Sequence, residues 1–594
     1  MRSVGFWIAA ALTLVVMAAL LELNKNSLWG FFALAAVNAG YLLLAGKLPE
    51  GAKWYVRIGV WLLWAAAFAG IFLLSWPKVR SVPAARGRGL AKTETVSVGQ
   101  GLVRGVVTKD GAVEVFAGIP YAAPPVGENR WREPQDPENW EGVLEADTFA
   151  PMSMQPVGMP LVDSLKQIFG FHDYRIRLDD NYRAPVSEDS LYLNIWRPAG
   201  EHEALPVLVF IHGGSLQTGQ PWWADYSGEG LSREGVIVVN MGYRLGVFGF
   251  LASDELAAES PNGTTGNYGL LDQIKALEWV RDNIAAFGGD PANVTLAGES
   301  AGAACVSALC TSPLAKGLFR RAVLESSTVA SYEPPHSFRP LDEAKKSGLE
   351  LMERHGCADI SALRDLPADK LVSEAYTQHH ITVDGYVLTE KPYDSYKKGL
   401  HNEEALLHGY NAEESAAFII MQGANMKNFE PRVRGVFKEL ADEVLALYPV
   451  SNDAEAKAAW AEIWGALFFD HSHYALNRLA ADNGIPVYEY VFTRSNGRLG
   501  AWHSGEMVYF YGNIDPASRL FDKRDRELEA EMTAYLVNFM KYGDPNGSGD
   551  TSLPEWPENS SSEDLMELGA VTAPVKERKL ALYGLIDRLR ESGE

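Results

Sequence analysis

The stretch "VTLAGESAGAAC", residues 294–305, places Ser300 between two glycines directly after an apolar, β-branched run. The residues before the serine favour the end of a buried strand, and "SAGAACVSAL", residues 300–309, favours a helix whose first turn carries small side chains. The segment therefore predicts a strand, a sharp turn at the serine, and a helix.

The pattern G-x-S-x-G raises the question whether Ser300 is a nucleophile or an ordinary turn serine. A chain with 55 glycines produces this pattern by chance, so the predicted strand, turn and helix carry the inference. Gly298 and Gly302 remove the Cβ atoms that would crowd a strained turn, and the helix N-terminus points its amides toward charge developing beside the hydroxyl. We interpret Ser300 as a nucleophile, with a structural turn as the alternative.

Strands and helices alternate around this segment. "LPVLVFIHGG", residues 205–214, and "VIVVNMGYR", residues 236–244, are near-continuous apolar runs, typical of strands buried on both faces of a parallel sheet. "GLLDQIKALEWVRDNIAAFGG", residues 269–289, favours an amphipathic helix ended by glycines. The alternation predicts an α/β fold with a mostly parallel central sheet flanked by helices.

A serine nucleophile also needs a base, an acid that orients the base, and donors for the oxyanion of the tetrahedral intermediate. Paired glycines follow the predicted strand at 205–214, as in the glycine loops that supply such donors. We expect the backbone N–H groups of Gly214, Ser215 and Ala301 to form the oxyanion hole. The alternative for the glycine pair is an ordinary turn.

Charge is divided unevenly along the 594 residues. The net charge is −23, but residues 1–92 hold ten Lys and Arg against two acidic residues, which leaves the rest strongly acidic. An acidic globular part repels a phosphate backbone, so nucleic acid is not an expected partner. The three cysteines, Cys305, Cys310 and Cys357, form neither a disulfide framework nor a zinc spacing, and we expect no metal or cofactor.

Three uncharged apolar runs occupy residues 3–21, 26–46 and 58–77. Each is long enough for a helix to cross roughly 30 Å of hydrocarbon. We predict a membrane anchor of three transmembrane helices over 1–77, a basic linker over 78–94 and the catalytic domain over 95–594. The alternatives are buried core helices or, for the first run, a cleaved signal peptide.

The chain is similar to the type-B carboxylesterase and lipase family, which includes the cholinesterases. "EDSLYLNIW" at 188–196, the block at 266–302 that ends in "VTLAGESAG", and "FMKYGDPNG" at 539–547 carry the resemblance, which covers about 95–590. The resemblance implies the α/β-hydrolase fold and the rest of a catalytic triad.

The acid and the base come from this resemblance. "LLHGYNAEESAAF", residues 406–418, resembles the segment that carries the family's acid, which implies Glu414, with Glu413 and Asp384 as competitors. "AWHSGEMVYFYG", residues 501–512, resembles the family's histidine loop with Ser504 in place of a glycine, which implies His503. His471 and His473 are the competing histidines, and we expect them to be structural.

The expected function is a serine carboxylesterase that cleaves small-molecule esters through an acyl-enzyme, without a cofactor, and is integral to the plasma or inner membrane. The alternatives are a membrane-associated lipase and a catalytically silent adhesion or sensor module. Basic residues are nearly balanced across the three spans, so they do not orient the anchor. The family's frequent export favours an extracytoplasmic domain, whereas the unpaired cysteines favour the cytoplasm. The oligomeric state is not indicated.

Overall fold

The computed structural model describes residues 4–49, 51–169, 181–374, 377–419, 423–495, 499–548, 552–559 and 563–591. The chain divides into two compact units. The first, called unit 1, holds Met1–Ser81 with Val157–Pro185, and the second, called unit 2, holds Val82–Pro156 with Val186–Glu594. No sequence pattern pointed to 157–185 as part of the first unit.

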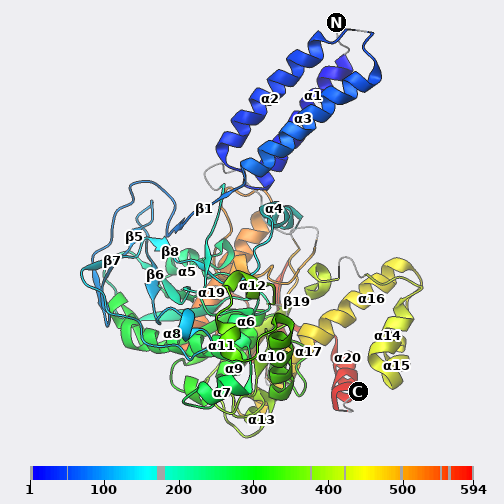
Figure 1. Ribbon diagram of the computed structural model, residues 1–594. Coiled ribbons are helices and arrows are strands. Elements are labelled where there is room, and N and C mark those ends of the chain that lie inside the picture. The colour runs from blue at the N-terminus through cyan, green and yellow to red at the C-terminus, as the bar shows by residue number, and fades with distance from the viewer. Residues whose placement is uncertain are drawn as a thin grey trace. The chain divides into compact units, whose positions relative to one another are not determined.

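Unit 1 is built on α1 (Val4–Leu23), α2 (Leu28–Lys47) and α3 (Trp54–Leu74), drawn in blue in Figure 1. All three are long and apolar enough to cross a membrane, so the prediction of three apolar helices is confirmed. The third begins earlier than the apolar run and ends before Pro77. Backbone hydrogen bonding, rather than apolarity, sets helix ends, and the residue before a proline disfavours helical geometry.

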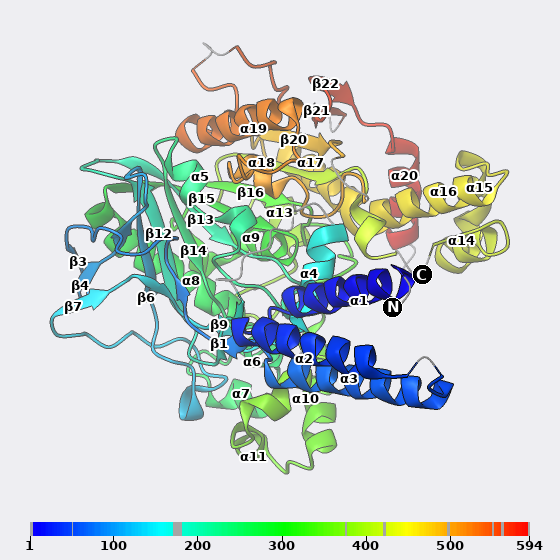
Figure 2. The ribbon, with the colours of Figure 1, turned by 90° about the horizontal axis from the view of Figure 1, so that it is seen from above.

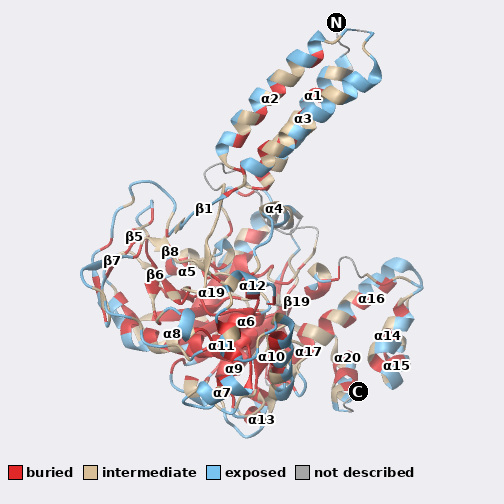
Figure 3. Ribbon diagram, in the orientation of Figure 1, coloured by how far each residue is buried: buried red, intermediate tan, exposed pale blue. Residues whose placement is uncertain are grey.

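The three helices pack through a narrow seam. Met17, Leu21, Leu34, Trp64 and Ile71 form its buried cluster. In Figure 3, exposed and half-buried residues cover much of the outer sides of these helices, in contrast to the buried interior of unit 2. A bundle with apolar side chains on its outer surface and few in its interior is typical of helices that are surrounded by lipid.

Unit 2 contains, within its described residues, an eleven-stranded sheet in the order β22-β21-β20-β19-β16-β15-β13-β14-β12-β6-β5 (Figure 2). The strands from β14 through β13 to β21 pair in parallel, whereas β22, β12, β6 and β5 pair antiparallel to their neighbours. The strand bounds are β5 (Val106–Val107), β6 (Val113–Pro120), β12 (Tyr192–Pro198), β13 (Leu205–Ile211), β14 (Ile237–Met241), β15 (Gly289–Glu299), β16 (Arg321–Glu325), β19 (Leu406–Asn411), β20 (Val487–Phe492), β21 (Asp564–Leu568) and β22 (Thr572–Lys576).

Successive residues of β13 face two different cores. Val207, Val209 and Ile211 belong to one hydrophobic cluster, and Leu208 and Phe210 belong to another. This alternation explains the near-continuous apolar run, because a strand covered on both faces has no solvent side. The mostly parallel sheet, with helices on both faces, is the fold predicted from the sequence.

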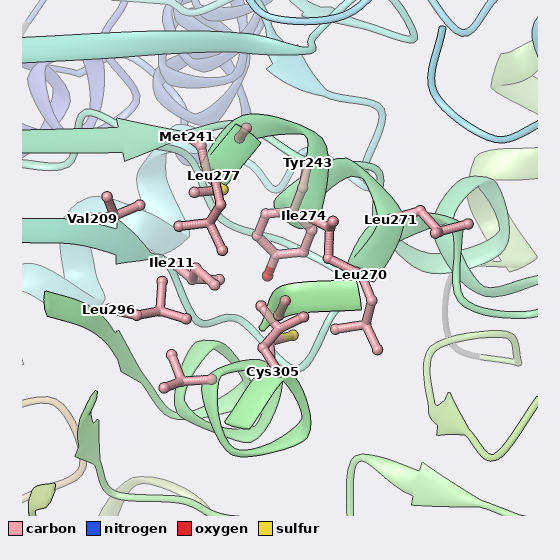
Figure 4. Packing of buried hydrophobic residues seen from close by; sticks show 14 of the residues in the cluster. Val209, Ile211, Met241, Tyr243, Leu270, Leu271, Ile274, Leu277, Leu296 and Cys305 are labelled. Carbon is pink, nitrogen blue, oxygen red and sulfur yellow. The ribbon is translucent and has the colours of Figure 1, made fainter. Parts of the chain in front are cut away.

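Helices supply the residues that cover each face. In Figure 4, Val209, Ile211 and Leu296 of the sheet lie near Ile274 and Leu277 of α8 and Cys305 of α9. Burying one such aliphatic side chain contributes about 1.5–3 kcal/mol to stability. Helix α19, with a short helix before it, covers the opposite face. The longer helices of unit 2 are α8 (Tyr268–Asn283), α9 (Ala301–Thr311), α10 (Leu341–His355), α14 (Phe429–Phe437), α16 (Asp453–Gly465), α17 (His471–Asp482), α19 (Lys523–Tyr542) and α20 (Leu580–Glu591).

Candidate active site

Ser300 lies in the turn between β15 and α9, with φ of 54° and ψ of −126°. A side chain in this left-handed region costs roughly 1–2 kcal/mol, so the surrounding structure has to hold it there. The Ser300 N–H donates to the Glu325 carbonyl at 2.8 Å. A Cβ atom added to Gly302 would lie 2.0 Å from the Ile211 carbonyl oxygen, and one on Gly298 would lie 2.5 Å from the carbonyl carbon of Gly302. The glycines therefore let strand, turn and helix approach closely enough to present the serine.

His503 connects the serine to an acid. Its Nε2 lies 2.8 Å from Ser300 Oγ, and its Nδ1 lies 2.6 Å from Glu414 Oε2. Glu414 begins the short 3-10 helix η7 (Glu414–Ala417) just after β19, and His503 lies between β20 and α18 (Met507–Phe510). The Asn411 N–H donates to the other Glu414 oxygen at 2.8 Å, which fixes the orientation of the carboxylate. The structure thus brings the three residues expected of a triad within hydrogen-bonding distance.

Charge around His503 favours its protonated form. Burial lowers the pKa of His503, but attraction to Glu414 and Glu299 outweighs burial and raises the pKa to about 9. Glu299 Oε1 lies 3.4 Å from Nε2, on the side of the ring that faces the serine. The imidazole can therefore accept a proton, and the resulting imidazolium is stabilised where it forms.

Further carboxyl groups lie buried near the histidine loop. Burial raises the pKa of Glu299, Glu325 and Glu506 above the usual range, and the charges of neighbouring carboxylates add to this effect for each of them. Ser504 Oγ donates to Glu299 at 2.5 Å, which opposes the rise at that residue. Asn411 donates to Glu506. Glu325 is distant from His503 in the chain and comes near it only through the sheet, whereas Glu506 lies in the histidine loop itself, three residues after His503.

Aromatic rings enclose one side of the imidazole. The ring centroid of Phe418 lies 5.1 Å from that of His503, and that of Phe469 lies 4.8 Å away. Phe469 comes from a π-helical turn, Ala466–Asp470, between α16 and α17. Such turns are frequent at functional sites, but the sequence carries no pattern that predicts one. These rings restrict the motion of the histidine and limit its contact with water.

The glycine loop after β13 lies close to the serine and carries backbone N–H groups without a partner among the described residues. Gly214, Ser215 and Leu216 all have positive φ, of 111°, 57° and 57°. The N–H groups of Gly214, Ser215 and Ala301 make no hydrogen bond with any part of the chain that the structure describes. A Cβ on Gly213 would lie 3.0 Å from Ser300 Cβ, so the loop passes directly against the serine. Free backbone donors on a loop that passes against the serine are the kind of groups that an oxyanion needs.

The competing residues have other partners. Glu413 accepts from the Ala501 N–H, and Asp384 accepts from the N–H groups of Val387 and Leu388 at 3.0 Å each. His471 lies 2.8 Å from Asp587, and His473 lies 3.0 Å from His408. Each of them thus has a partner away from the serine, and their geometry is that of structural polar groups.

Two tryptophans after the glycine loop have different environments. Trp222 stacks on Phe149 with a centroid distance of 5.4 Å, so it packs against the protein, whereas Trp223 is 43% exposed.

Within the described residues, no cluster of three or more His, Cys, Asp or Glu side chains is arranged to hold a metal ion.

Comparison with known proteins gives an independent view of the chain. A family model described as the Carboxylesterase family matches residues 92–582. Fumonisin B1 esterase of Sphingopyxis macrogoltabida is 35% identical over 547 residues, covering 87% of this chain and 93% of that protein. The medium-chain fatty acyl-CoA hydrolase precursor of Anas platyrhynchos is 30% identical over 545 residues, covering 83% and 92%. Human Carboxylesterase 3 is 32% identical over 511 residues, covering 79% and 85%.

Proposed function

The chain belongs to the Carboxylesterase family and is a carboxylic ester hydrolase, and from that premise we propose that it acts through an acyl-enzyme formed on Ser300. The observation that carries the proposal is the imidazole of His503, which lies between Glu414 and Ser300 with one ring nitrogen bonded to each. The imidazole accepts the proton of the nucleophile, and Glu414 fixes the tautomer of the imidazole that makes this possible.

In the first half-reaction, Ser300 Oγ attacks the ester carbonyl carbon while His503 Nε2 takes the hydroxyl proton. The carbonyl π bond opens, and the resulting oxyanion accepts hydrogen bonds from the N–H groups of Gly214, Ser215 and Ala301. Losing one such donor typically costs about 2.7–4 kcal/mol in the barrier. The tetrahedral intermediate then collapses, the bond to the alkoxide oxygen breaks, and the imidazolium gives its proton to the departing alcohol.

The second half-reaction repeats these steps with water. His503 removes a proton from a water molecule, whose oxygen attacks the acyl carbon. The intermediate collapses with cleavage of the bond to Ser300 Oγ, which regains its proton from the imidazolium, and the carboxylic acid leaves. Glu414 keeps the imidazole in the required orientation and stabilises the imidazolium twice per turnover.

The decisive experiment is the Ser300→Ala substitution, assayed with p-nitrophenyl butyrate. We expect kcat to fall by roughly 10⁶-fold, the size seen when a triad nucleophile is removed. The matched control is Ser327→Ala, since Ser327 is also buried and its Oγ has no partner within the described residues. The control should keep its activity, and a fluorophosphonate probe should label it but not the Ser300 variant. Equal activity of the two variants would exclude Ser300 as the nucleophile.

We also propose that α1, α2 and α3 anchor the enzyme in the plasma or inner membrane, with the catalytic unit extracytoplasmic. The length and apolarity of all three helices support this anchorage. Protease accessibility of residues beyond 95 in intact cells tests the side, because an extracytoplasmic unit is cleaved without lysis. Protection in intact cells together with cleavage after lysis would place the unit in the cytoplasm.

Membrane anchorage keeps a lipase open as a second candidate function. Relatives named for fumonisin B1 and for fatty acyl-CoA differ in the substrate that their names give. A panel of p-nitrophenyl esters separates the candidates: activity that rises past about ten carbons, with activation above substrate solubility, indicates a lipase, and a maximum at short acyl chains indicates an esterase.

A further inference from the structure

Helix α4 (Pro160–Phe169) belongs to the same compact unit as the three long apolar helices and packs against α1. Figure 1 shows it at the end of the bundle opposite the chain's N-terminus. At 100° per residue, Leu161, Val162, Leu165 and Ile168 fall within an arc of about 120° on one side of the helix. The helix is therefore amphipathic, unlike its three neighbours.

Two residues on the apolar side of α4 are exposed. Ser164, outside this arc, is only 3% exposed, whereas Val162 and Ile168 are 45% and 43% exposed. Val157 and Met159, just before the helix, are 39% and 44% exposed. A helix on a water-soluble protein buries its apolar side and exposes its polar side. Val162 and Ile168, at the two edges of the apolar arc, are therefore available to a nonpolar environment, whereas Leu161 and Leu165 between them are half-buried.

The segment that carries α4 is tied to the end of the bundle. Asn181 Nδ2 donates to the Asn26 carbonyl at 2.9 Å, in the loop between α1 and α2. Strand β10 (Tyr182–Arg183) pairs in parallel with β1 (Lys78–Val79), which follows α3. The hydrogen bond and the strand pairing therefore both lie where the apolar helices end.

Aromatic and basic residues mark this end of unit 1. Trp29 and Trp76 lie at the ends of α2 and α3, and the basic residues at this end include Lys25, Lys78 and Arg80. Tryptophan and basic residues concentrate where hydrocarbon meets headgroups, and basic side chains attract anionic lipids. The same end of unit 1 thus combines exposed apolar side chains of α4 with residues suited to lipid headgroups.

We propose that α4 is an interfacial helix that lies along the membrane surface, with Val162 and Ile168 inserted at the boundary between headgroups and acyl chains. The proposal rests on the proposed anchorage by α1, α2 and α3. A bilayer fits this surface because the adjoining residues are basic and aromatic. A second protein chain could cover the same face, so the experiment has to distinguish the two.

The test uses the full chain in vesicles of phosphatidylcholine with a minor fraction of phosphatidylglycerol. Cys305 and Cys310 are buried, so Cys357→Ser leaves a background for labelling. Val162→Cys and Ile168→Cys each receive an environment-sensitive NBD fluorophore, and lipids carry a doxyl quencher either near the headgroup or at mid-chain. Leu63→Cys, at a position in α3 that is 71% exposed, reports the anchor, and Glu128→Cys, whose native side chain is 88% exposed, reports water.

At positions 162 and 168, we expect emission shifted to the blue and stronger quenching by the shallow than by the deep quencher. Position 63 should show the reverse order, and position 128 should show neither effect. Deep quenching at 63 without quenching at 162 and 168 overturns the α4 proposal and leaves the anchorage standing. Blue-shifted but unquenched emission at 162 and 168 assigns the face to protein and also overturns it. Loss of quenching at 63 refutes the anchorage itself. Hydrolysis of p-nitrophenyl butyrate by every labelled variant confirms that it is folded.

Discussion

Two buried clusters in unit 2 combine histidine with a carboxyl group and reach opposite charge states. In the candidate active site, burial lowers the pKa of His503, but Glu414 and Glu299 raise it to about 9. In the second cluster, burial lowers the pKa of His408 to about 3 and that of His473 well below its usual value. The histidines are buried in both clusters, so the difference in their pKa values must come from the groups that they contact.

The second cluster is a chain of neutral hydrogen bonds. His408 Nε2 lies 3.0 Å from Asn477 Oδ1, an acceptor, which assigns the His408 proton to Nε2. The Nδ1 atoms of His408 and His473 are 3.0 Å apart, so His473 donates to His408. Asn477 in turn donates to Glu489, and burial raises the pKa of Glu489 well above its usual value. A neutral acid gives no charge to hold an imidazolium.

Of the histidines in these two clusters, the one that contacts a carboxyl group directly is the one whose pKa is raised. Glu414 contacts His503 Nδ1, whereas an amide separates Glu489 from His408. The second nitrogen also matters: His503 Nε2 meets the hydroxyl of Ser300, whereas His473 Nε2 is buried without a partner within the described residues. The cluster around His503, called the active cluster, can transfer a proton to and from Ser300. The cluster of His408 and His473, called the structural cluster, has no such partner for proton transfer.

Replacing each histidine gives the largest contrast. We expect His503→Ala to lower kcat by roughly 10⁶-fold, because the loss of one triad member disables the others. His473→Asn keeps a donor in the place of Nδ1, so it should leave kcat within a few-fold of the native value. Stopped-flow assays with p-nitrophenyl butyrate measure both. A comparable loss in the two variants would mean that the structural cluster takes part in catalysis.

The adjacent acids Glu414 and Glu413 provide the next contrast. Glu414→Gln preserves shape but removes the charge that supports the imidazolium, so kcat should fall by roughly 10⁴-fold. Glu413→Gln keeps an oxygen that accepts from the Ala501 N–H, so its effect on kcat should be under roughly tenfold. Measuring kcat for both purified variants, with circular dichroism as a check on folding, shows which glutamate supports the imidazolium. The reverse order of losses would assign the acid to Glu413.

Sequence alone predicted the serine turn but not its two distant partners. Around Ser300, strand, turn and helix are contiguous, so local pattern and glycine placement predict the conformation. Glu414 and His503 follow different strands, and only the order of strands in the sheet brings those ends together, so a resemblance was needed to name them. Adjacent Glu413 and Glu414 differ because the 3-10 turn begins between them, which composition does not reveal. The π-helical turn that positions Phe469, and the return of residues 157–185 to unit 1, depend equally on long-range packing.

The two clusters should give opposite pH dependences of stability. The raised pKa of His503 stabilises the fold fully below about pH 6.5, and this stability is lost as pH rises through about 9. His408 and His473 are neutral in the fold, so their contribution is present above about pH 6.5 and is lost as pH falls below it. Each such group changes the free energy of unfolding by roughly 1 kcal/mol per pH unit within its window.

Urea unfolding of the full chain in detergent, followed by tryptophan fluorescence, measures these slopes. His473→Asn should flatten the acid side only, and His503→Ala should flatten the interval between about pH 6.5 and 9 only. Identical pH profiles of the two variants would show that the clusters do not differ in charge.

Ser504→Gly gives the smallest effect and tests how the active cluster keeps its charge. Ser504 has φ of 74°, so glycine relieves roughly 1 kcal/mol of backbone strain while removing the hydrogen bond to Glu299. Without that bond the pKa of Glu299 rises further, its charge supports the imidazolium less, and the pKa of His503 falls. Because the neutral imidazole is the reactive base, the rise of kcat/KM with pH should move to lower pH by less than about one unit.

Glu299→Gln, which removes the charge entirely, should move the rise of kcat/KM further in the same direction. A shift in Glu299→Gln without any shift in Ser504→Gly would show that the hydroxyl of residue 504 does not tune the base.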